Sequence, residues 1–370
     1  MPFSAIDAIS PAFEHTKRQL LQPFRFGQWT RLAFVGLLAG ELSSGGCHVP
    51  NLSNFNIPRR PGTEHFMFPG AGTDPMLYAG LIATLVASAF VLGILLMYIS
   101  SVMRFILFDS VLAKECHIRQ GWSRRQGPGW RYFVWKLLYS LVTLGVLTVL
   151  VGIPLGFAFA VGWLTDPKQH LVPLVLGGIV LFFAFMIFVI VSAVIYVLTK
   201  DFVVPQMAFE PIGAIEGWRR LWAMMKAEKG GYAGYIGMKI VLAVGAAILL
   251  GIVGFIIALI ILIPAAGVAV AAVLGGKAAG LGWTVTTISL AVVAGCVLLA
   301  IFLSITSLIA VPAIVFFPAY SIYFFAARYP ALSASLYPAP PVPPAFQNPP
   351  DSPPPPYDPP PLPPAPEPIG

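Results

Sequence analysis

The chain has 370 residues, of which 58% are hydrophobic and only 10% are charged, and its formal net charge is +7. A soluble domain carries about a quarter charged residues, so this composition excludes an ordinary soluble globular protein. Proline is also uneven, since 18 of the 36 prolines lie in residues 338–370. We therefore expect an all-α bundle of membrane helices followed by a disordered, proline-rich C-terminal tail.

The N-terminal segment, residues 1–26, is predicted to be cytoplasmic and to contain an amphipathic helix. Apolar residues recur there at spacings of three to four, and Ser10-Pro11 suits a helix start. Such a helix either lies in the membrane interface or packs against the spans. The sequence leaves both arrangements open.

Long charge-free stretches follow, and a spanning helix needs about 20 apolar residues. Residues 27–327 are predicted to form a bundle of about six spans, over residues 27–43, 77–103, 132–163, 171–199, 233–263 and 284–311. An outer loop would occupy residues 44–76, and inner loops residues 104–131 and 200–232. The first span is the weakest because Arg31 and Glu41 flank a short apolar centre, and we expect both charges to reach water by snorkelling.

Proline is expected to end two of these spans. Pro264 should break the fifth and leave Ala265–Gly276 as an outer or re-entrant piece, and Pro312 should end the sixth. The sequence leaves open whether residues 265–283 and 313–327 re-enter or cross the membrane. The aromatic residues after Pro312 suit the headgroup layer; they are Phe316, Phe317, Tyr320, Tyr323, Phe324, Phe325 and Tyr329.

Lysine and arginine are concentrated on one side of this topology. With six crossings and the N-terminus inside, 18 of the 22 lie in inner segments. The positive-inside rule then places both termini in the cytoplasm and the chain in the plasma membrane, the inner membrane of a bacterium. The positive charge of the inner segments also favours contact with anionic lipid. We expect no nucleic-acid partner, because no soluble basic face is present.

Two inner segments share an order of residues. Asp109 is followed by Gly121-Trp122-Ser123-Arg124-Arg125 and Lys136, and Asp201 is followed by Gly217-Trp218-Arg219-Arg220 and Lys239; Trp29 and Arg31 form a degenerate third copy. The order indicates either a duplicated helix pair or an accumulation of Trp and Arg in inner segments. Each aspartate could pair with the following lysine, but separate charges that reach water are favoured.

Tryptophan and arginine both suit the headgroup layer, where Arg reaches lipid phosphate. We therefore predict lipid-headgroup contacts at Trp29, Arg31, Trp122, Arg124, Arg125, Trp218, Arg219 and Arg220. The second inner segment also contains an amphipathic helix that begins at Pro211. Its apolar stripe comprises Ile212, Ile215, Trp218, Leu221, Trp222 and Met225. We expect it in the interface or packed on the spans.

The sequence contains no pattern that predicts catalysis. The five histidines have no metal-ligand spacing, and Cys47, Cys116 and Cys296 fall in different compartments. Within the confident spans no charged residue lies away from the ends, which argues against an ion-coupled transporter. We expect no enzyme, no cofactor and no metal.

The tail, residues 328–370, favours an extended polyproline II conformation. Its strip Pro354-Pro355-Pro356-Tyr357 matches the PPxY pattern that WW domains bind. This strip is the predicted docking site for a protein partner. In a bacterium a disordered tether or docking strip is favoured over a WW ligand.

Several segments resemble a known family. They are Gln22–Trp29, Arg104–Asp109 and Asp201–Pro205, with Gly217–Arg220 after the last. They resemble an uncharacterised family of prokaryotic multi-pass membrane proteins, distantly similar to the membrane domain attached to some glycerophosphodiester phosphodiesterases. The hydrolase domain is missing here, so the resemblance implies no activity and no catalytic residue.

These observations favour a non-enzymatic integral membrane protein that organises lipid or protein partners through a basic cytoplasmic face and the proline-rich tail. A homo-oligomer is compatible with them. The alternative is a transporter or lipid-handling permease with a cavity at helices broken by Pro154 and Pro264.

Overall fold

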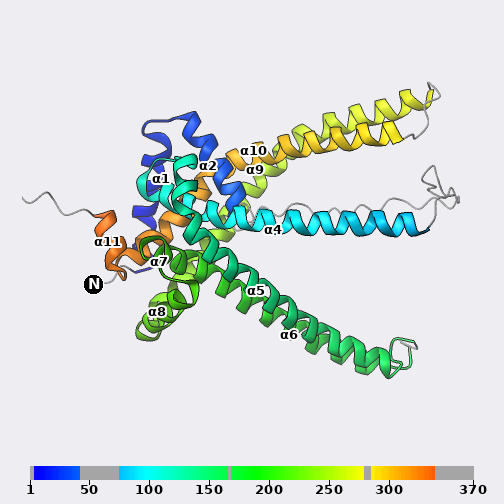
Figure 1. The fold of residues 1–370 in the computed structure, drawn as a ribbon, viewed down its shortest axis with the longest axis horizontal. Helices are drawn as coiled ribbons and strands as arrows, with labels where there is room; N and C mark the ends of the chain where they lie inside the picture. Colours follow the sequence, from blue (N-terminus) through cyan, green and yellow to red (C-terminus); the bar gives the residue numbers. More distant parts are fainter. Residues whose placement is uncertain (1–3, 42–74, 166–167, 279–284, 338–370) are drawn as a thin grey trace, which may run out of the picture.

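The computed structural model describes residues 4–41, 75–165, 168–278 and 285–337, which form helices with no strand among them. The helices divide into a base and three arms that project from one side of it (Figure 1). Five helices are long and apolar enough to cross a membrane. The prediction of an all-α membrane protein is confirmed, with five candidate spans in the described part rather than about six.

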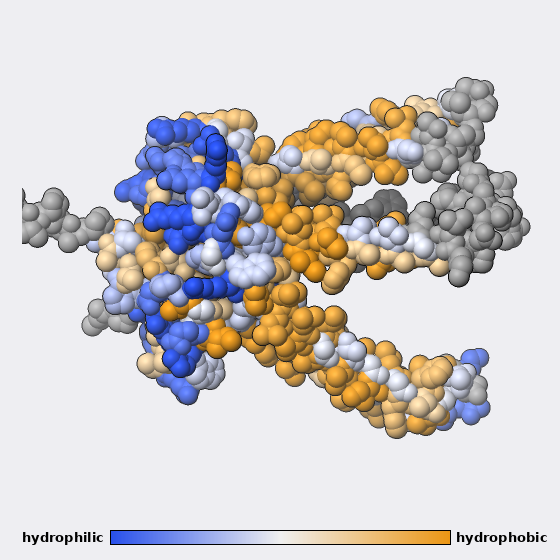
Figure 2. All heavy atoms as spheres, in the orientation of Figure 1, coloured by the Kyte–Doolittle hydropathy of each residue, from blue (hydrophilic) through white to orange (hydrophobic). Residues whose placement is uncertain are grey.

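The arms consist of the long helices. α4 (Pro75–Ala113) forms one arm; α5 (Ile118–Ala160) and α6 (Leu171–Leu198) form the second; α9 (Lys229–Ala278) and α10 (Val285–Ala326) form the third. The arms diverge from the base, and hydrophobic side chains cover their surfaces (Figure 2). In the most apolar 18-residue stretch of each span, at most 6% of the residues are buried. Hydrocarbon is the medium that accommodates such helices.

The base gathers the ends of the long helices and all the short ones. The short helices are α1 (Ile9–Leu21), α2 (Phe26–Ala39), the π-helical turn η2 (Thr199–Val203), α7 (Val204–Phe209), α8 (Ala214–Ala227) and α11 (Pro330–Leu336). Phe202 of η2 lies at the centre of an aromatic core. Its ring centroid is 4.9–5.9 Å from those of four other rings, which belong to Tyr232, Tyr235, Phe324 and Phe325.

This core corrects one expectation. The aromatic residues near the end of α10 were predicted in the headgroup layer, but Tyr320, Phe324 and Phe325 are fully buried. They fill the junction between α10 and its neighbours instead. The amphipathic ring of Tyr suits both environments, so composition alone did not separate the two locations.

The predicted breaks at proline are also wrong. Pro264 lies inside α9, and Pro312 and Pro318 lie inside α10, so α9 continues to Ala278 and α10 to Ala326. A chain end or loop exposed to hydrocarbon would leave several backbone groups without partners. One missing hydrogen bond at proline costs less, so the helix continues.

The predicted inner loops are largely helical. α4 continues to Ala113 and α5 begins at Ile118, so residues 114–117 link the two helices. Most of residues 200–232 likewise belong to η2, α7, α8 and the start of α9. These extensions bury apolar faces, as at Phe105 and Ile106 of α4. Such burial stabilises helical turns beyond the part of α4 that a bilayer would cover.

The helix that occupies most of the predicted first span, α2, is too short to cross a membrane. α2 has 14 residues, whereas a crossing needs about 20. It runs across the inner ends of α4 and α10 in Figure 1. The indole N–H of Trp29 donates to the carbonyl of Leu308 at 2.8 Å, and the hydroxyl of Ser307 donates to the carbonyl of Ala33 at 2.7 Å. α2 is therefore attached crosswise to α10.

The first and last helices lie on the same side. His15 of α1 contacts Val111 and Tyr323, and the hydroxyl of Tyr320 donates to the carbonyl of Ala5. α1 thus packs against the inner ends of α4 and α10, as the packing alternative predicted. That this side is cytoplasmic stays a prediction.

Glu41 and Pro75 lie on opposite sides of the apolar layer. Glu41 contacts Arg104 of α4, whereas α4 begins at Pro75, about 40 Å away along the helix axis. The predicted outer loop, residues 44–76, falls almost wholly outside the described residues, and so does the tail from residue 338.

Candidate functional site: a buried ionic cluster

The base encloses five charged residues, which we name the ionic cluster: Glu41, Arg104, Lys200, Asp201 and Lys239. They come from the end of α2, from α4, from η2 and from α9. Each side chain is at most 12% exposed. Charged side chains are almost never buried to this extent unless they are paired.

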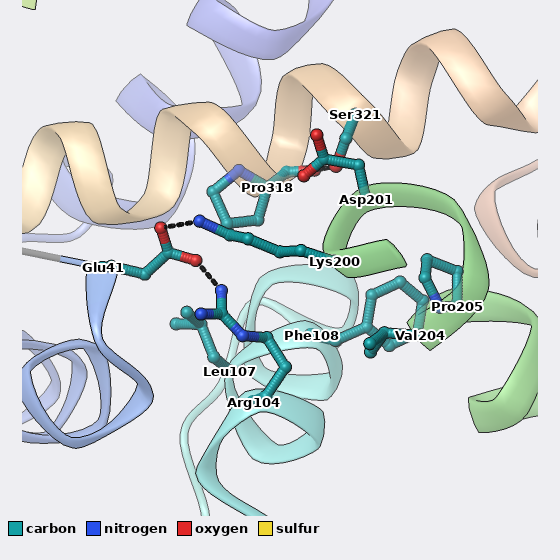
Figure 3. Close-up of a pocket in the computed structure, with 10 residues that line it drawn as sticks. All are labelled: Glu41, Arg104, Leu107, Phe108, Lys200, Asp201, Val204, Pro205, Pro318 and Ser321. Carbon is teal, nitrogen blue, oxygen red and sulfur yellow. Dashed lines mark hydrogen bonds and ion pairs between the residues drawn. The ribbon is translucent and has the colours of Figure 1, made fainter. Parts of the chain in front are cut away.

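Glu41 joins two cations. One carboxylate oxygen accepts from the guanidinium of Arg104, and the other accepts from the ammonium group of Lys200 (Figure 3). Arg104 also donates to the carbonyl of Ala39 at 2.6 Å. Glu41 thereby connects the end of α2 to both α4 and η2.

Asp201 forms a second unit beside the first. Its carboxylate pairs with Lys239 and accepts from the hydroxyl of Tyr235 at 2.9 Å. Because Asp201 follows Lys200 directly, η2 contributes to both units. The ionic cluster therefore connects α2, α4, η2 and α9 through charge-assisted hydrogen bonds, the stronger kind.

Charge balance makes the two carboxylates critical. The ionic cluster contains three cations and two anions, and removing an ion from water costs several kcal/mol. Pairing offsets that cost only while each cation keeps its carboxylate. The arrangement is therefore sensitive to the loss of Glu41 or Asp201.

The π-helical turn places adjacent charges in the interior. All five residues of η2 are buried, including Lys200 and Asp201. The hydroxyl of Thr199 accepts from the indole N–H of Trp218 at 3.0 Å, which attaches α8 to this turn. Single π-helical turns occur often at functional sites, and here the turn brings both charges to partners on different helices.

A small cavity adjoins the ionic cluster. Its volume is about 20 Å³, which is room for roughly one water molecule. Glu41, Arg104, Lys200 and Asp201 line it together with Pro318 and Ser321 of α10. The cavity is too small for an organic substrate, so the geometry favours a role in holding helices together.

The tryptophans predicted at the headgroup layer all contact protein. Trp29 and Trp218 donate their indole N–H groups to Leu308 and Thr199. Trp122 packs edge to face on Tyr98, with ring centroids 6.2 Å apart. The three side chains are partly buried, and lipid contact at their exposed edges stays a prediction.

Two of the predicted headgroup arginines are partly buried and engaged in ion pairs. Arg125 donates to both carboxylate oxygens of Asp109, at 2.6 and 2.7 Å. Arg220 pairs with Glu210 at 2.5 Å and Glu216 at 3.2 Å.

The other three arginines are exposed, namely Arg31, Arg124 and Arg219. Arg219 still reaches Glu216 at 2.8 Å, with its side chain 79% exposed. Phosphate contact at these three stays a prediction. The predicted docking strip, Pro354 to Tyr357, lies outside the described residues.

The two copies of the predicted repeat share one packing relationship. A Cβ added at Gly121 would lie 3.1 Å from Ile106, and one added at Gly217 would lie 2.7 Å from Val203. Each Gly-Trp pair thus packs closely on the end of the preceding long helix. This is a feature that duplicated helix pairs would share, and the duplication stays a prediction.

Three acidic residues differ from the favoured expectations, namely Asp109, Asp201 and Glu41. Asp109 pairs with Arg125 rather than with Lys136, whereas Asp201 does form the alternative pair with Lys239. The favoured alternative, separate charges that reach water, is therefore wrong for both aspartates. Glu41 was expected to snorkel, yet it is 4% exposed. Its position at the end of a short apolar helix was the available signal, since ionisable groups at such places mark functional or structural sites.

Further ion pairs and hydrogen bonds connect helices of the base near the end of α10. Arg328, just after α10, donates to both carboxylate oxygens of Glu228, at 2.6 and 2.8 Å. These bonds lower the pKa of Glu228. Tyr329 donates to Glu210 at 2.6 Å, and this bond, with that from Arg220, lowers the pKa of Glu210. The contacts connect the start of α9 and the end of α7 to the end of α10.

The fold and the site together define a helical membrane protein whose base is fixed by buried ion pairs. Residues 3–335 match the family described as "Family of unknown function (DUF7544)", and the chain belongs to that family. No curated protein matches the chain, and no solved structure matches it. The prediction of an uncharacterised family is confirmed, while the likeness to membrane domains of glycerophosphodiester phosphodiesterases stays a prediction.

Proposed function

We propose that this protein is a non-enzymatic membrane scaffold that organises lipid or protein partners around its three arms. The observation that carries this proposal is the contrast between the interlocked base and the diverging arms. The base is fixed by ion pairs and aromatic packing, whereas the arms leave most of their apolar surface uncovered.

The base is suited to fix where the arms enter the membrane. The ionic cluster and the aromatic core connect helices that belong to different arms, α4, α9 and α10 among them. A fully paired polar network rigidifies the structure that surrounds it. A rigid base would hold the three arms at constant positions, as a scaffold requires.

The arms offer surface to partners within the membrane. One side chain from each arm illustrates this, with Phe90 68%, Val180 69% and Val293 59% exposed. Lipid tails or the helices of partner proteins would cover such faces, since helix association in membranes depends on close packing. On the base, exposed Arg124 and Arg219 and the proline-rich tail would add contacts to lipid phosphate and to a soluble partner.

Photo-crosslinking in cells tests the scaffold. A photoreactive amino acid is placed in turn at Phe90, Val180 and Val293, and at buried Phe202 as the control. We expect adducts with lipids or with discrete partner proteins at the three exposed positions and none at the control. Adducts that join the arms of one chain to each other would contradict the proposal, because the arms would then close on themselves.

A flux assay distinguishes the permease alternative. That alternative was based on helices broken at Pro154 and Pro264, and both prolines lie inside continuous helices. We expect the purified chain to move neither fluorescent phospholipid nor small solutes across liposomes. Protein-dependent flux above that of empty liposomes would count against the scaffold.

A further inference from the structure

The base carries an unusual group of exposed apolar side chains around α2. Leu21, Phe24 and Phe26 are 56%, 57% and 64% exposed, and Phe34 is 50% exposed. Phe26 and Phe34 lie eight residues apart on one face of the helix, with Thr30 between them. We name these four residues, Leu21, Phe24, Phe26 and Phe34, the aromatic rim. Exposed clusters of this kind mark interaction sites.

α2, which carries Phe26 and Phe34, lies where base and arms meet. α2 crosses the inner ends of α4 and α10 in Figure 1, and in Figure 2 hydrophilic surface gives way to hydrophobic surface in the same zone. Trp29 fixes this position through its hydrogen bond to Leu308 of α10. Ile301, about 10 Å further along α10, is 48% exposed on the apolar arm. Trp29 therefore lies about 10 Å, measured along α10, from the exposed apolar surface of that arm.

Cations lie among the rim residues. Arg25 and Arg31 are exposed, and so is Lys114, whose carbonyl accepts from the side chain of Gln28. The nearest exposed carboxylate in sequence, Glu115, lies 3.7 Å from His117. The surface thus combines aromatic side chains with an excess of positive charge. This combination is complementary to a headgroup layer that contains anionic lipid.

We propose that the aromatic rim inserts into the leaflet next to the base, where Arg25, Arg31 and Lys114 bind the phosphates of anionic phospholipids. α2 then acts as an interfacial helix rather than as a membrane span. This surface deepens the proposed scaffold function, on which it rests, by naming the lipid class that the base organises.

Fluorescence quenching tests the insertion. The full chain, with its three cysteines replaced by serine, receives one cysteine by Phe24→Cys or Phe34→Cys and an environment-sensitive label, and is placed in nanodiscs with brominated phospholipid. The matched control is Ala334→Cys, at an exposed position of α11, at the end of the base opposite the arms. We expect quenching several-fold stronger at positions 24 and 34 than at position 334. Equal quenching at all three would overturn the proposal.

Native mass spectrometry tests the choice of lipid. The triple variant Arg25→Gln/Arg31→Gln/Lys114→Gln should retain less anionic phospholipid, by about fivefold for each charge removed, with zwitterionic lipid unchanged. The control removes three exposed charges elsewhere on the base, by Arg131→Gln/Lys226→Gln/Lys229→Gln. Equal losses in the two variants would overturn the assignment to the rim.

The two proposals fail separately. If the rim labels are quenched but the arms capture no lipid or partner, the scaffold fails and the lipid surface remains. If the arms capture partners but the rim labels behave like the control, the lipid surface fails and the scaffold remains. Labelled and triple variants are compared with the wild-type chain by size-exclusion chromatography to establish that each is folded.

Discussion

Glu41 lies between Arg104 and Lys200, which are 63 and 159 residues away in the sequence, and bonds to each with a different carboxylate oxygen. Substituting one acid should therefore affect two buried cations. Glu41→Gln keeps the shape of the side chain but removes the charge that both cations face. We expect the free energy of unfolding to fall by about 3–5 kcal/mol, the usual cost of breaking a buried pair.

Thermal unfolding in detergent micelles measures this loss. The matched control is Glu14→Gln, because Glu14 pairs with Arg18 at the surface of α1. An exposed pair contributes at most about 1 kcal/mol, so this variant should unfold almost as the wild type does. Similar midpoints for the two variants would show that Glu41 does not stabilise the base.

Two glycines of α5 provide a second comparison. A Cβ at Gly129 would lie 2.7 Å from Cγ2 and 3.2 Å from the backbone Cα of Val102, while a Cβ at Gly145 would meet nothing within 4 Å. Gly129→Ala should destabilise the fold by about 1–3 kcal/mol through overpacking. Gly145→Ala should be neutral or should stabilise the helix by up to about 1 kcal/mol. Denaturant unfolding that ranks the two variants in the opposite order would contradict the close contact of α4 and α5.

The pH dependence of stability should reflect His15. Burial lowers the pKa of His15 below its ordinary value of 6.5, and nearby Lys114 and Arg18 act in the same direction. The unfolded chain then binds the proton more readily than the folded chain does. Stability that is complete above about pH 6.5 should therefore decrease as the pH falls towards the lower, folded-state pKa.

Unfolding midpoints between pH 8 and pH 5 test this expectation. In the wild type Nε2 of His15 lies 2.8 Å from the carbonyl oxygen of Val111, and Nδ1 lies 3.2 Å from the hydroxyl of Tyr323. His15→Gln removes the titrating group, so its midpoint should vary less over this interval. A variant with the same pH profile as the wild type would assign the effect to another group.

Trp218 allows the internal role of a tryptophan to be measured. Trp218→Phe removes the hydrogen bond to Thr199 and should cost about 1 kcal/mol. Thr199→Val should cost a similar amount, and the double variant should cost less than the sum because both changes remove one bond. Trp222→Phe on the same helix is the control, since that side chain is 54% exposed. Additive losses would contradict a shared bond.

Thiol labelling tests on which side of the membrane each end of α5 lies. Cys116 is unsuitable because it is 3% exposed and burial raises the pKa of its thiol. A cysteine-free chain with Glu115→Cys or Lys168→Cys serves instead, since both positions are exposed. We expect an impermeant reagent to modify position 168 on intact cells, and position 115 only after lysis. The reverse pattern would invert the orientation, and equal reactivity would contradict the span between them.

Hydropathy predicted much of the fold because apolar helices in lipid need only length and the absence of charge. Each of the five later predicted spans accordingly falls mostly within one long helix of the described residues. Helix ends were predicted wrongly where a rule that depends on local sequence was opposed by the surroundings of the chain. Pro264 and Pro312 would end a helix in water, but helices continue through proline where lipid or neighbouring helices surround the chain. The inner segments became helices because faces such as that of Phe105 are buried by tertiary packing.

The candidate site was much less accessible to sequence reasoning. Glu41 meets its partners only after α2, α4 and η2 have come together, and no local spacing predicts such distant contacts. The two aspartates were recognised, yet the rule that surface ion pairs are weak led to the wrong expectation for the partly buried Asp109 and the buried Asp201. Pairing of Lys239 with Asp201 was one of the two predicted alternatives. The Lys239 side chain is only 12% exposed, which explains why it pairs with Asp201 instead of reaching water.

The attachment of α1 and α2 to α10 also determines the order in which the molecule can be completed. His15, Trp29 and Ala33 contact Tyr323, Leu308 and Ser307, which leave the ribosome about 270 to 310 residues later. The first two helices must therefore wait beside the membrane while the helices from α4 to α9 are synthesised. Assembly of the base is a late, post-insertion event, and a chain truncated before α10 cannot acquire it.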